Sequence, residues 1–435
     1  MTWVDIPAET NFPVENLPYG AFSTGDADPR IGVAIGDSVL DLAPLLDDPA
    51  FAEQTLNRFL AQGRPRWREV RARITELLTE DRHRSAVEPH LIPQDTVSLH
   101  LPFEVADYVD YYASEDHARN LGQMFRPDQA ALTPNWKWIP IGYHGRSGTV
   151  VVSGTPVVRP SGQRKAPSDP VPSFGPSRRL DIEAELGFVV GPGTRLGEPV
   201  PLDLVEEHLF GVVVVNDWSA RDIQAWEYVP LGPYLGKSFA TSVSPWVVPF
   251  EALEEARIPP PPRDPQPLPY LLGDADRGLD VALEVRLNGE VLSRPPYARM
   301  YWSPEQMLTH MTANGASLRT GDFFASGTIS GPEPDQRGSF IEMSWNGTQP
   351  LRLADGSTRC FLEDGDTITI TARARGRGGA QIGFGEVTGT IRPAVVEERL
   401  AQTPGENAAP EVPDAVRQPD HPRRQTGSTD LGPGR

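Results

Sequence analysis

The segment GVVVVNDWSARDIQAWEYVPLGPY, residues 211–234, predicts a buried strand that runs directly into a short polar helix. Val212–Val215 is a run of β-branched residues, which is typical of a strand covered on both faces. Asp217 follows this run and is therefore expected where the strand leaves the core. Ser219 is expected to cap the helix, which cannot continue past Pro230.

The predicted helix carries polar side chains on one face. Arg221, Gln224 and Tyr228 are spaced i, i+3 and i+7, so they share that face. Together with Asp217 they would bring a carboxylate, a guanidinium, an amide and a phenol into one small volume. A helix packed in a core has no use for such a face, so the segment predicts a functional site.

A second segment, LDIEAELGFVV at residues 180–190, alternates acidic and apolar residues. In a strand, Asp181, Glu183 and Glu185 would share one face while the apolar residues enter the core. This pattern alone fits a solvated outer face. However, like charges on one β face repel each other, and a divalent cation would turn that repulsion into attraction. Both interpretations stay open from this segment alone.

Other polar residues lie in four further segments. Residues 107–125, DYVDYYASEDHARNLGQMF, hold Asp110, Tyr112 and His117, and Arg126 follows them. A Gly-rich loop, residues 140–148, carries Tyr143. A later loop, placed before another strand, holds Lys237 and Thr241. Residues 321–345 predict a strand, a Gly-rich turn around Thr328 and a second strand that holds Glu342.

Composition restricts the class of protein. The 46 prolines and 40 glycines among 435 residues favour many short strands joined by turns. A net charge of -19 argues against binding to nucleic acid, whose phosphates require a basic surface. The first twenty residues lack the regions of a signal peptide, and no apolar run approaches the ~20 residues of a membrane span. A cytoplasmic protein that does not act at a membrane is expected.

The chain is expected to divide into three parts. Residues 1–100 predict a small β-rich domain, with a hairpin at Gly36-Asp37. Residues 101–396 contain all the segments of the predicted site. Residues 397–435 are polar and have few apolar anchors, so a disordered tail is predicted there.

The residue types point to hydrolysis. Four carboxylates without a neighbouring cysteine or histidine ligand favour Mg²⁺, Ca²⁺ or Mn²⁺ over Zn²⁺; they are Asp110, Glu183, Glu185 and Asp217. His117 is a candidate general base, and Glu342 is a candidate for orienting it. Donors suited to an oxyanion are Arg221, Gln224 and Lys237. With no nucleophilic Ser or Cys indicated, this set predicts attack by water on a carbonyl. Tyr112, Arg126, Tyr143 and Tyr228 are candidates for holding an anionic substrate.

Several motifs together resemble the fumarylacetoacetate hydrolase family. They are DYVDYYASEDHARNLGQMFR, PNWKWIPIGYHGR, LDIEAELGFVVGPG, NDWSARDIQAWEYVPLGPYLGKSF, ASGTISGPEP and IGFGE. The resemblance implies a mainly β fold with short helices (α+β). It would comprise a small SH3-like barrel at the amino end and a large β-sandwich roll, and the protein would be a homodimer. It also implies hydrolysis of the carbon–carbon bond of 4-fumarylacetoacetate, a diketo dicarboxylate, to fumarate and acetoacetate, the last step of tyrosine and phenylalanine catabolism.

The resemblance further implies a role for each candidate. The cation ligands would be Asp110, Glu183, Glu185 and Asp217. His117 would deprotonate water, oriented by Glu342, and the alkoxide would be stabilised by Arg221, Gln224 and Lys237. Substrate contacts would come from Tyr112, Arg126, Tyr143, Gln224, Tyr228 and Thr328. A second ion, Mg²⁺, would lie near Asp217, Lys237 and Thr241, with the lysine contributing its carbonyl oxygen.

Two alternatives remain. One is another diketo-acid enzyme of the same superfamily, such as an acylpyruvate hydrolase. The other is a non-enzymatic Ca²⁺-binding module, which would need the acidic cluster but not His117 with Glu342.

Overall fold

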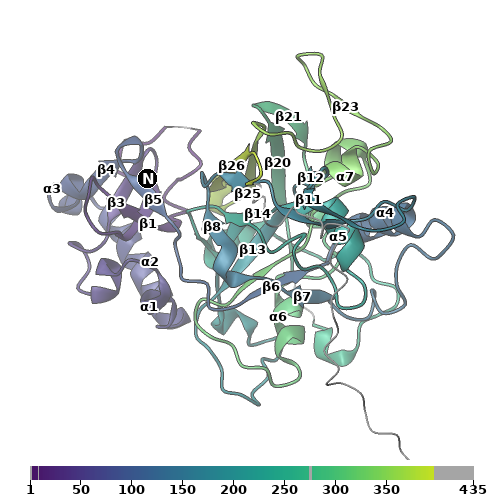
Figure 1. The fold of residues 1–435 in the computed structure, drawn as a ribbon. Coiled ribbons are helices and arrows are strands. Elements are labelled where there is room, and N and C mark those ends of the chain that lie inside the picture. The colour runs from purple at the N-terminus through teal and green to yellow at the C-terminus, as the bar shows by residue number, and fades with distance from the viewer. Residues whose placement is uncertain (1, 8, 274–276, 396–435) are drawn as a thin grey trace, which may run out of the picture. The chain divides into compact units, whose positions relative to one another are not determined.

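The protein is described from a computed structural model, which covers residues 2–7, 9–273 and 277–395 (Figure 1). The predicted tail at 397–435 lies outside the described residues. The predicted division into parts 1–100 and 101–396 stays a prediction. The mainly β architecture with short helices is confirmed.

The amino-terminal residues form a five-stranded antiparallel sheet with the order β4-β3-β2-β1-β5. Its strands are β1 (Tyr19–Ser23), β2 (Arg30–Ile35), β3 (Ser38–Asp41), β4 (Leu91–Pro93) and β5 (Ser98–His100). The predicted hairpin at Gly36-Asp37 joins β2 to β3, which pair from Ile35 and Ser38 onward. The helices of this region are α1 (Asn57–Leu60), α2 (Arg64–Thr79) and α3 (Arg84–Val87). Helix α2 buries one face, which includes Trp67, Val70 and Ile74.

An eight-stranded sheet forms the centre of the molecule and includes the strand predicted from Val212–Val215. Its main path is β7 (Gly142–His144), β6 (Tyr108–Tyr111), β22 (Phe323–Ala325), β13 (Ala184–Val190), β14 (Leu209–Asp217), β16 (Thr241–Val243) and β8 (Val150–Val152). A further strand, β17 (Val248–Pro249), pairs with β14. Every residue of β14 is buried, as predicted for a strand covered on both faces.

The two faces of β14 pack into different cores. Val212 and Val214 belong to the larger core, together with residues of a five-stranded sheet. That sheet has the order β21 (Glu290–Ser293), β20 (Val281–Leu287), β25 (Thr367–Arg375), β26 (Gln381–Arg392) and β9 (Val157–Val158). Val213 and Val215 instead join the core of the amino-terminal region. Because side chains alternate along a strand, this one run of valines packs into both cores.

Short elements complete the described chain. Four two-stranded ladders pair β10 (Ser161–Arg164) with β11 (Ser173–Pro176), β12 (Leu180–Asp181) with β15 (Ser219–Ala220), β18 (Arg257–Ile258) with β19 (Gly278–Leu279), and β23 (Leu351–Arg352) with β24 (Thr358–Arg359). The remaining α-helices are α4 (Glu115–Phe125), α5 (Arg221–Glu227), α6 (Pro304–Thr312) and α7 (Phe340–Met343).

Three local predictions are wrong. Residues 180–190 form two strands, because the chain leaves the ladder between Asp181 and Ala184. Ser219 does not cap α5: its hydroxyl donates to the carbonyl of Asp217, and Ala220 precedes the helix. Glu342 lies in α7, a single helical turn, and not in a strand.

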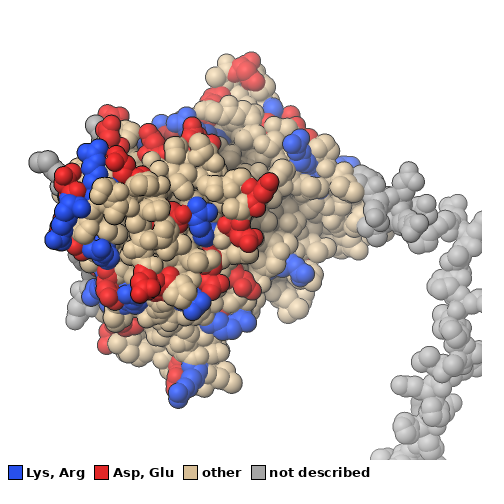
Figure 2. All heavy atoms as spheres, turned by 90° about the vertical axis from the view of Figure 1, so that its left-hand side faces the viewer, with Lys and Arg blue, Asp and Glu red and all other residues tan. Residues whose placement is uncertain are grey.

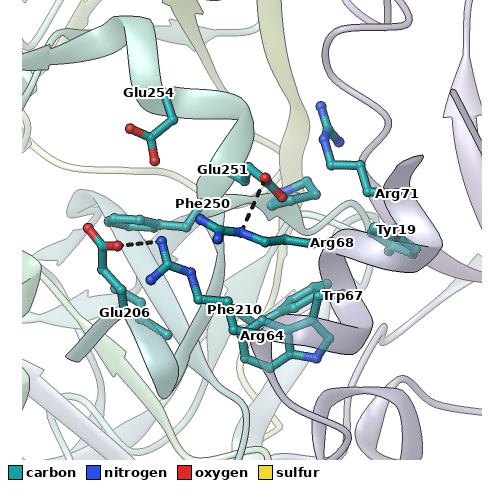
Figure 3. Close-up of a pocket in the computed structure, with 12 residues that line it drawn as sticks. Tyr19, Arg64, Trp67, Arg68, Arg71, Glu206, Phe210, Phe250, Glu251 and Glu254 are labelled. Atoms are coloured by element: carbon teal, nitrogen blue, oxygen red, sulfur yellow. Dashed lines mark ion pairs between the residues drawn. The ribbon is translucent and has the colours of Figure 1, made fainter. Parts of the chain in front are cut away.

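Helix α2 contacts the central sheet region through both apolar and charged side chains. Trp67 packs edge-on against Phe210, with ring centroids 5.1 Å apart. Figure 3 shows Arg64 and Arg68 extending from α2 toward Glu206 and Glu251, with N–O distances of 2.5 and 3.5 Å. The pocket drawn there is lined by these paired charges and apolar side chains, and none of the predicted site residues lines it.

The surface mixes charges of both signs. Figure 2 shows acidic and basic side chains interspersed on the face that it draws. Exposed pairs such as Arg58–Glu53, at 2.7 Å, each contribute little to stability because water screens them. Among residues 2–7, 9–273 and 277–395, no helix has the length and apolar character needed to cross a membrane.

Candidate active site

The fold gathers four acidic side chains from different segments. The carboxylates of Asp110, Glu183, Glu185 and Asp217 are all buried, and one oxygen from each lies within 4.8 Å of the others. The sheet order β6-β22-β13-β14 explains the gathering, because Asp110, Glu185 and Asp217 come from β6, β13 and the end of β14. Glu183 lies in the break between β12 and β13.

Two of these acids have no countercharge of their own. Asp110 Oδ1 and Glu185 Oε1 are buried and accept no hydrogen bond from the described residues. Burial, reinforced by neighbouring carboxylates, raises the pKa of both groups well above their usual range. Unpartnered buried carboxylate oxygens are costly, and a hard cation would satisfy both at once. The donor set therefore fits a divalent cation that prefers oxygen ligands.

The other two acids are paired with buried cations. Lys237 Nζ lies 2.5 Å from Asp217 Oδ2 and 2.8 Å from Glu183 Oε2. Arg221 Nη1 donates to Glu183 Oε1 at 2.6 Å. Burial would raise the pKa of Glu183, but the two cations hold it well below its usual range. Thr241 Oγ1 donates to Asp217 Oδ1 at 2.8 Å.

His117 and Glu342 form a buried pair, the interaction expected for an oriented base. His117 Nδ1 lies 2.7 Å from Glu342 Oε2. That oxygen also accepts from Ser330 and Ser339, while Oε1 accepts from Asn120. Burial would raise the pKa of Glu342, but His117 and these donors hold it below its usual value. With Nδ1–H donating to the carboxylate, the imidazole nitrogen left to take a proton is Nε2.

The elements that carry this pair lie next to each other. His117 is on α4 and Glu342 is on α7, and these two helices contact each other; both are labelled on the right-hand side of Figure 1. Asp181 links this pair to the acidic cluster, because it accepts from the first N–H groups of α7 and from Arg221, which also donates to Glu183. The base and the acidic cluster therefore share one buried region.

The candidates for binding substrate or oxyanion separate into two groups. Tyr112 stacks edge-on against His117 with ring centroids 5.4 Å apart, and Gln224 accepts from Arg221. Tyr143 lies opposite Asp110 in the β6–β7 ladder. Two donors near the cluster are buried without a described partner: Arg221 Nη2 and Thr328 Oγ1.

Two candidates lie further out. Arg126 donates to the carbonyl of Ala131, and the side chain of Tyr228 is exposed. No described contact joins either residue to the acidic cluster.

Sequence reasoning missed several residues that support the site. Asn120 lies one helical turn after His117, so its spacing on α4 was a usable signal. Ser330 and Ser339 gave no such signal, because only the tertiary fold brings them to Glu342. Asp181 is predicted to share a face with Glu183 and Glu185. It shares Arg221 with Glu183, but it is not among the four clustered acids and accepts from the first N–H groups of α7.

Comparison with known proteins covers nearly the whole described chain. A family model described as fumarylacetoacetate (FAA) hydrolase C-terminal matches residues 107–392, and one described as fumarylacetoacetase N-terminal matches residues 15–102. The fumarylacetoacetase of Homo sapiens is 48% identical over 418 residues, which cover 91% of this chain and 100% of the relative. That of Caenorhabditis elegans is 47% identical and covers 90% and 99%.

A solved structure shares the fold. The fumarylacetoacetate hydrolase of Exiguobacterium antarcticum superposes with a TM-score of 0.51 at 19% identity, covering 87% of this chain and 99% of that one. At this level of identity the likeness describes the fold alone.

Proposed function

The chain belongs to the fumarylacetoacetate hydrolase family, and from this premise we propose that its buried site hydrolyses the carbon–carbon bond of fumarylacetoacetate to fumarate and acetoacetate. It is an enzyme of the fumarylacetoacetase type. The observation that carries the proposal is the buried His117–Glu342 pair beside a carboxylate cluster with unpartnered oxygens. This arrangement combines a base for water with a site for a hard cation.

The proposed metal centre uses four carboxylates. Asp110, Glu183, Glu185 and Asp217 would hold Ca²⁺, Mg²⁺ or Mn²⁺. When bound, such a cation would stabilise the negative charge that develops on the departing acetoacetate enolate. We further propose a second Mg²⁺ near Asp217, Thr241 and the carbonyl oxygen of Lys237. The hydrogen bond between Thr241 and Asp217 supports this placement.

The side chains divide the chemistry among them. His117 Nε2 takes a proton from water, whose oxygen attacks the carbonyl carbon, and Glu342 holds Nδ1–H and stabilises the imidazolium. Arg221, Gln224 and Lys237 would stabilise the oxyanion, and Arg221 Nη2 has a free donor for it. Collapse of the oxyanion breaks the carbon–carbon bond, the electron pair passes to the leaving enolate, and His117 returns the proton. Tyr112, Arg126, Tyr143, Gln224, Tyr228 and Thr328 are the proposed substrate contacts.

A homodimer in the cytoplasm completes the proposal. The end of α5 and the segment that follows it expose several large apolar side chains: Trp226 at 41%, Val229 at 66%, Leu231 at 95%, Tyr234 at 65% and Leu235 at 46%. A run of this kind supports contact with another protein surface, here a second copy of the chain.

One assay tests the proposed activity: the loss of fumarylacetoacetate absorbance with and without a chelator. We expect turnover that the chelator stops and that added Mg²⁺, Ca²⁺ or Mn²⁺ restores. An acylpyruvate run in parallel tests the related diketo-acid activity. Ca²⁺ binding without turnover of either compound would contradict the proposal and favour the binding module.

A further inference from the structure

Asp181 is a buried carboxylate that the proposed chemistry does not use. Its side chain is 0% exposed and accepts four hydrogen bonds. One donor is Arg221 Nε, at 2.8 Å from Oδ2. The others are backbone N–H groups, from Ile182 at 2.7 Å and from Phe340 and Ile341 at 2.6 and 3.0 Å. One side chain on β12 thus contacts both α5 and α7.

The contact with α7 fixes the helical turn that carries Glu342. Phe340 and Ile341 are the first two residues of α7, and their N–H groups have no partner within the helix. The residue before them, Ser339, does not cap the turn, because its hydroxyl donates to Glu342 Oε2 instead. Asp181 supplies the cap from a strand more than 150 residues earlier in the sequence. The position of Glu342, and through it that of His117, therefore depends on Asp181.

The contact with α5 fixes the guanidinium of Arg221. Asp181 receives Nε–H, while Nη1 donates to Glu183 and Gln224. Nη2 is left buried without a described partner. Because the guanidinium is planar, holding Nε and Nη1 sets the direction of Nη2. Asp181 therefore sets the direction of Arg221 Nη2, one of the proposed oxyanion donors.

We propose that Asp181 is a positioning residue that fixes the His117–Glu342 pair and the Nη2 donor of Arg221 in place relative to each other. It is not among the four proposed cation ligands, and it acts through Arg221 and Glu342. This inference rests on the proposed function. A carboxylate is required here, because each of its two oxygens accepts only N–H donors, and an amide would turn an NH₂ group against one set of them.

The test is Asp181→Asn, assayed for turnover of fumarylacetoacetate and for Mn²⁺ binding by calorimetry. We expect kcat to fall roughly 10- to 100-fold, as for supporting residues around other sites, with KM and the Mn²⁺ affinity changed less than about threefold. In the double variant Arg221→Lys, Glu342→Gln, Asp181→Asn should lower kcat less than about threefold, because the two residues through which Asp181 acts are already changed. An equal loss of kcat in both backgrounds, or a wild-type kcat in Asp181→Asn, would overturn the inference.

Controls separate positioning from general destabilisation. Asp366 is 3% exposed and accepts from Arg359 Nε at 3.1 Å and from the backbone N–H of Glu363 at 2.8 Å, so it makes the same kinds of bonds outside the site. Asp366→Asn should lower the melting temperature and leave kcat unchanged. If Asp181→Asn does not fold, Asp181→Glu keeps the charge but displaces the carboxylate. We expect a reduced kcat from this variant, and an unchanged kcat would overturn the inference.

An inactive wild-type protein would instead refute the proposed function, which the absorbance assay tests separately.

Discussion

One ring nitrogen of His117 contacts a carboxylate, and we propose that the other takes a proton from water. The 2.7 Å contact with Glu342 and the three further donors on that carboxylate hold the ring in one orientation. We predict that His117→Ala lowers kcat by roughly 10²–10⁴, because general-base help is lost. Mn²⁺ affinity should change little and the variant should still fold, but its unfolding midpoint in urea should fall because buried Glu342 loses a partner.

The matched control is His208→Ala, because His208 makes one ring contact, a 2.8 Å bond to the carbonyl of Pro192, outside the site. Near-wild-type turnover in His117→Ala would refute the base assignment.

Glu342 should make stability depend on pH in one direction. Its pKa is lower in the folded protein than its ordinary value of 4.5, because His117 and its other donors outweigh burial. Its stabilising contribution is therefore fully present above about pH 4.5 and is lost as the pH falls through the folded-state pKa. We predict that Glu342→Gln lowers the free energy of unfolding, and that the difference from wild type is larger at about pH 7 than at about pH 4. Urea titrations in chelator measure this difference at each pH. A difference that grows toward low pH would contradict the prediction.

Among the strands, the acidic cluster should carry the metal-dependent part of stability. Glu185 Oε1 has no described partner, and burial raises the pKa of this carboxyl. We predict that Glu185→Gln melts no lower than wild type in chelator, since it removes a buried acid that has only one hydrogen bond among the described residues and lies beside three other carboxylates. A ligand at 100 times its Kd stabilises the folded state by about 2.7 kcal/mol, and this increase should largely disappear in the variant.

Differential scanning calorimetry with and without Mn²⁺ provides the measurement. Glu305→Gln is the control, because Glu305 is equally buried but pairs with Arg257. It should lower the melting temperature equally in both conditions. A full Mn²⁺ response in Glu185→Gln would exclude Glu185 as a ligand.

The elements also show what sequence patterns can and cannot predict. The valine run of β14 and the acids of β6 and β13 can be recognised from the local sequence. As expected, the structure buries the valines and brings the acids together. The sequence Ser339–Met343 is too short to distinguish a strand from a helical turn by periodicity. Asp181, which is distant in the sequence, favours the helical turn because it caps its first N–H groups. The break between β12 and β13 leaves Asp181 outside the group of four acids that contains Glu183, which strict alternation could not predict.

For the whole molecule, the exposed segment after α5 predicts association. Leu231 is 95% exposed, an unusual position for a large apolar side chain near other exposed apolar residues. We predict that wild type sediments as a dimer and that Leu231→Asp shifts it toward monomer. Leu196→Asp, at an 84% exposed leucine outside that segment, is the control and should stay dimeric. A monomeric wild type would contradict the proposed homodimer.

The central claim is that four distant carboxylates hold one hard cation beside the His117–Glu342 pair. The most direct measurement is a crystal structure of the protein grown with Mn²⁺, with an anomalous difference map recorded for the metal. We predict a peak about 2.0–2.6 Å from oxygens of Asp110, Glu183, Glu185 and Asp217, the range of hard-cation sites. A map in which saturating Mn²⁺ leaves this cluster without a peak would contradict it.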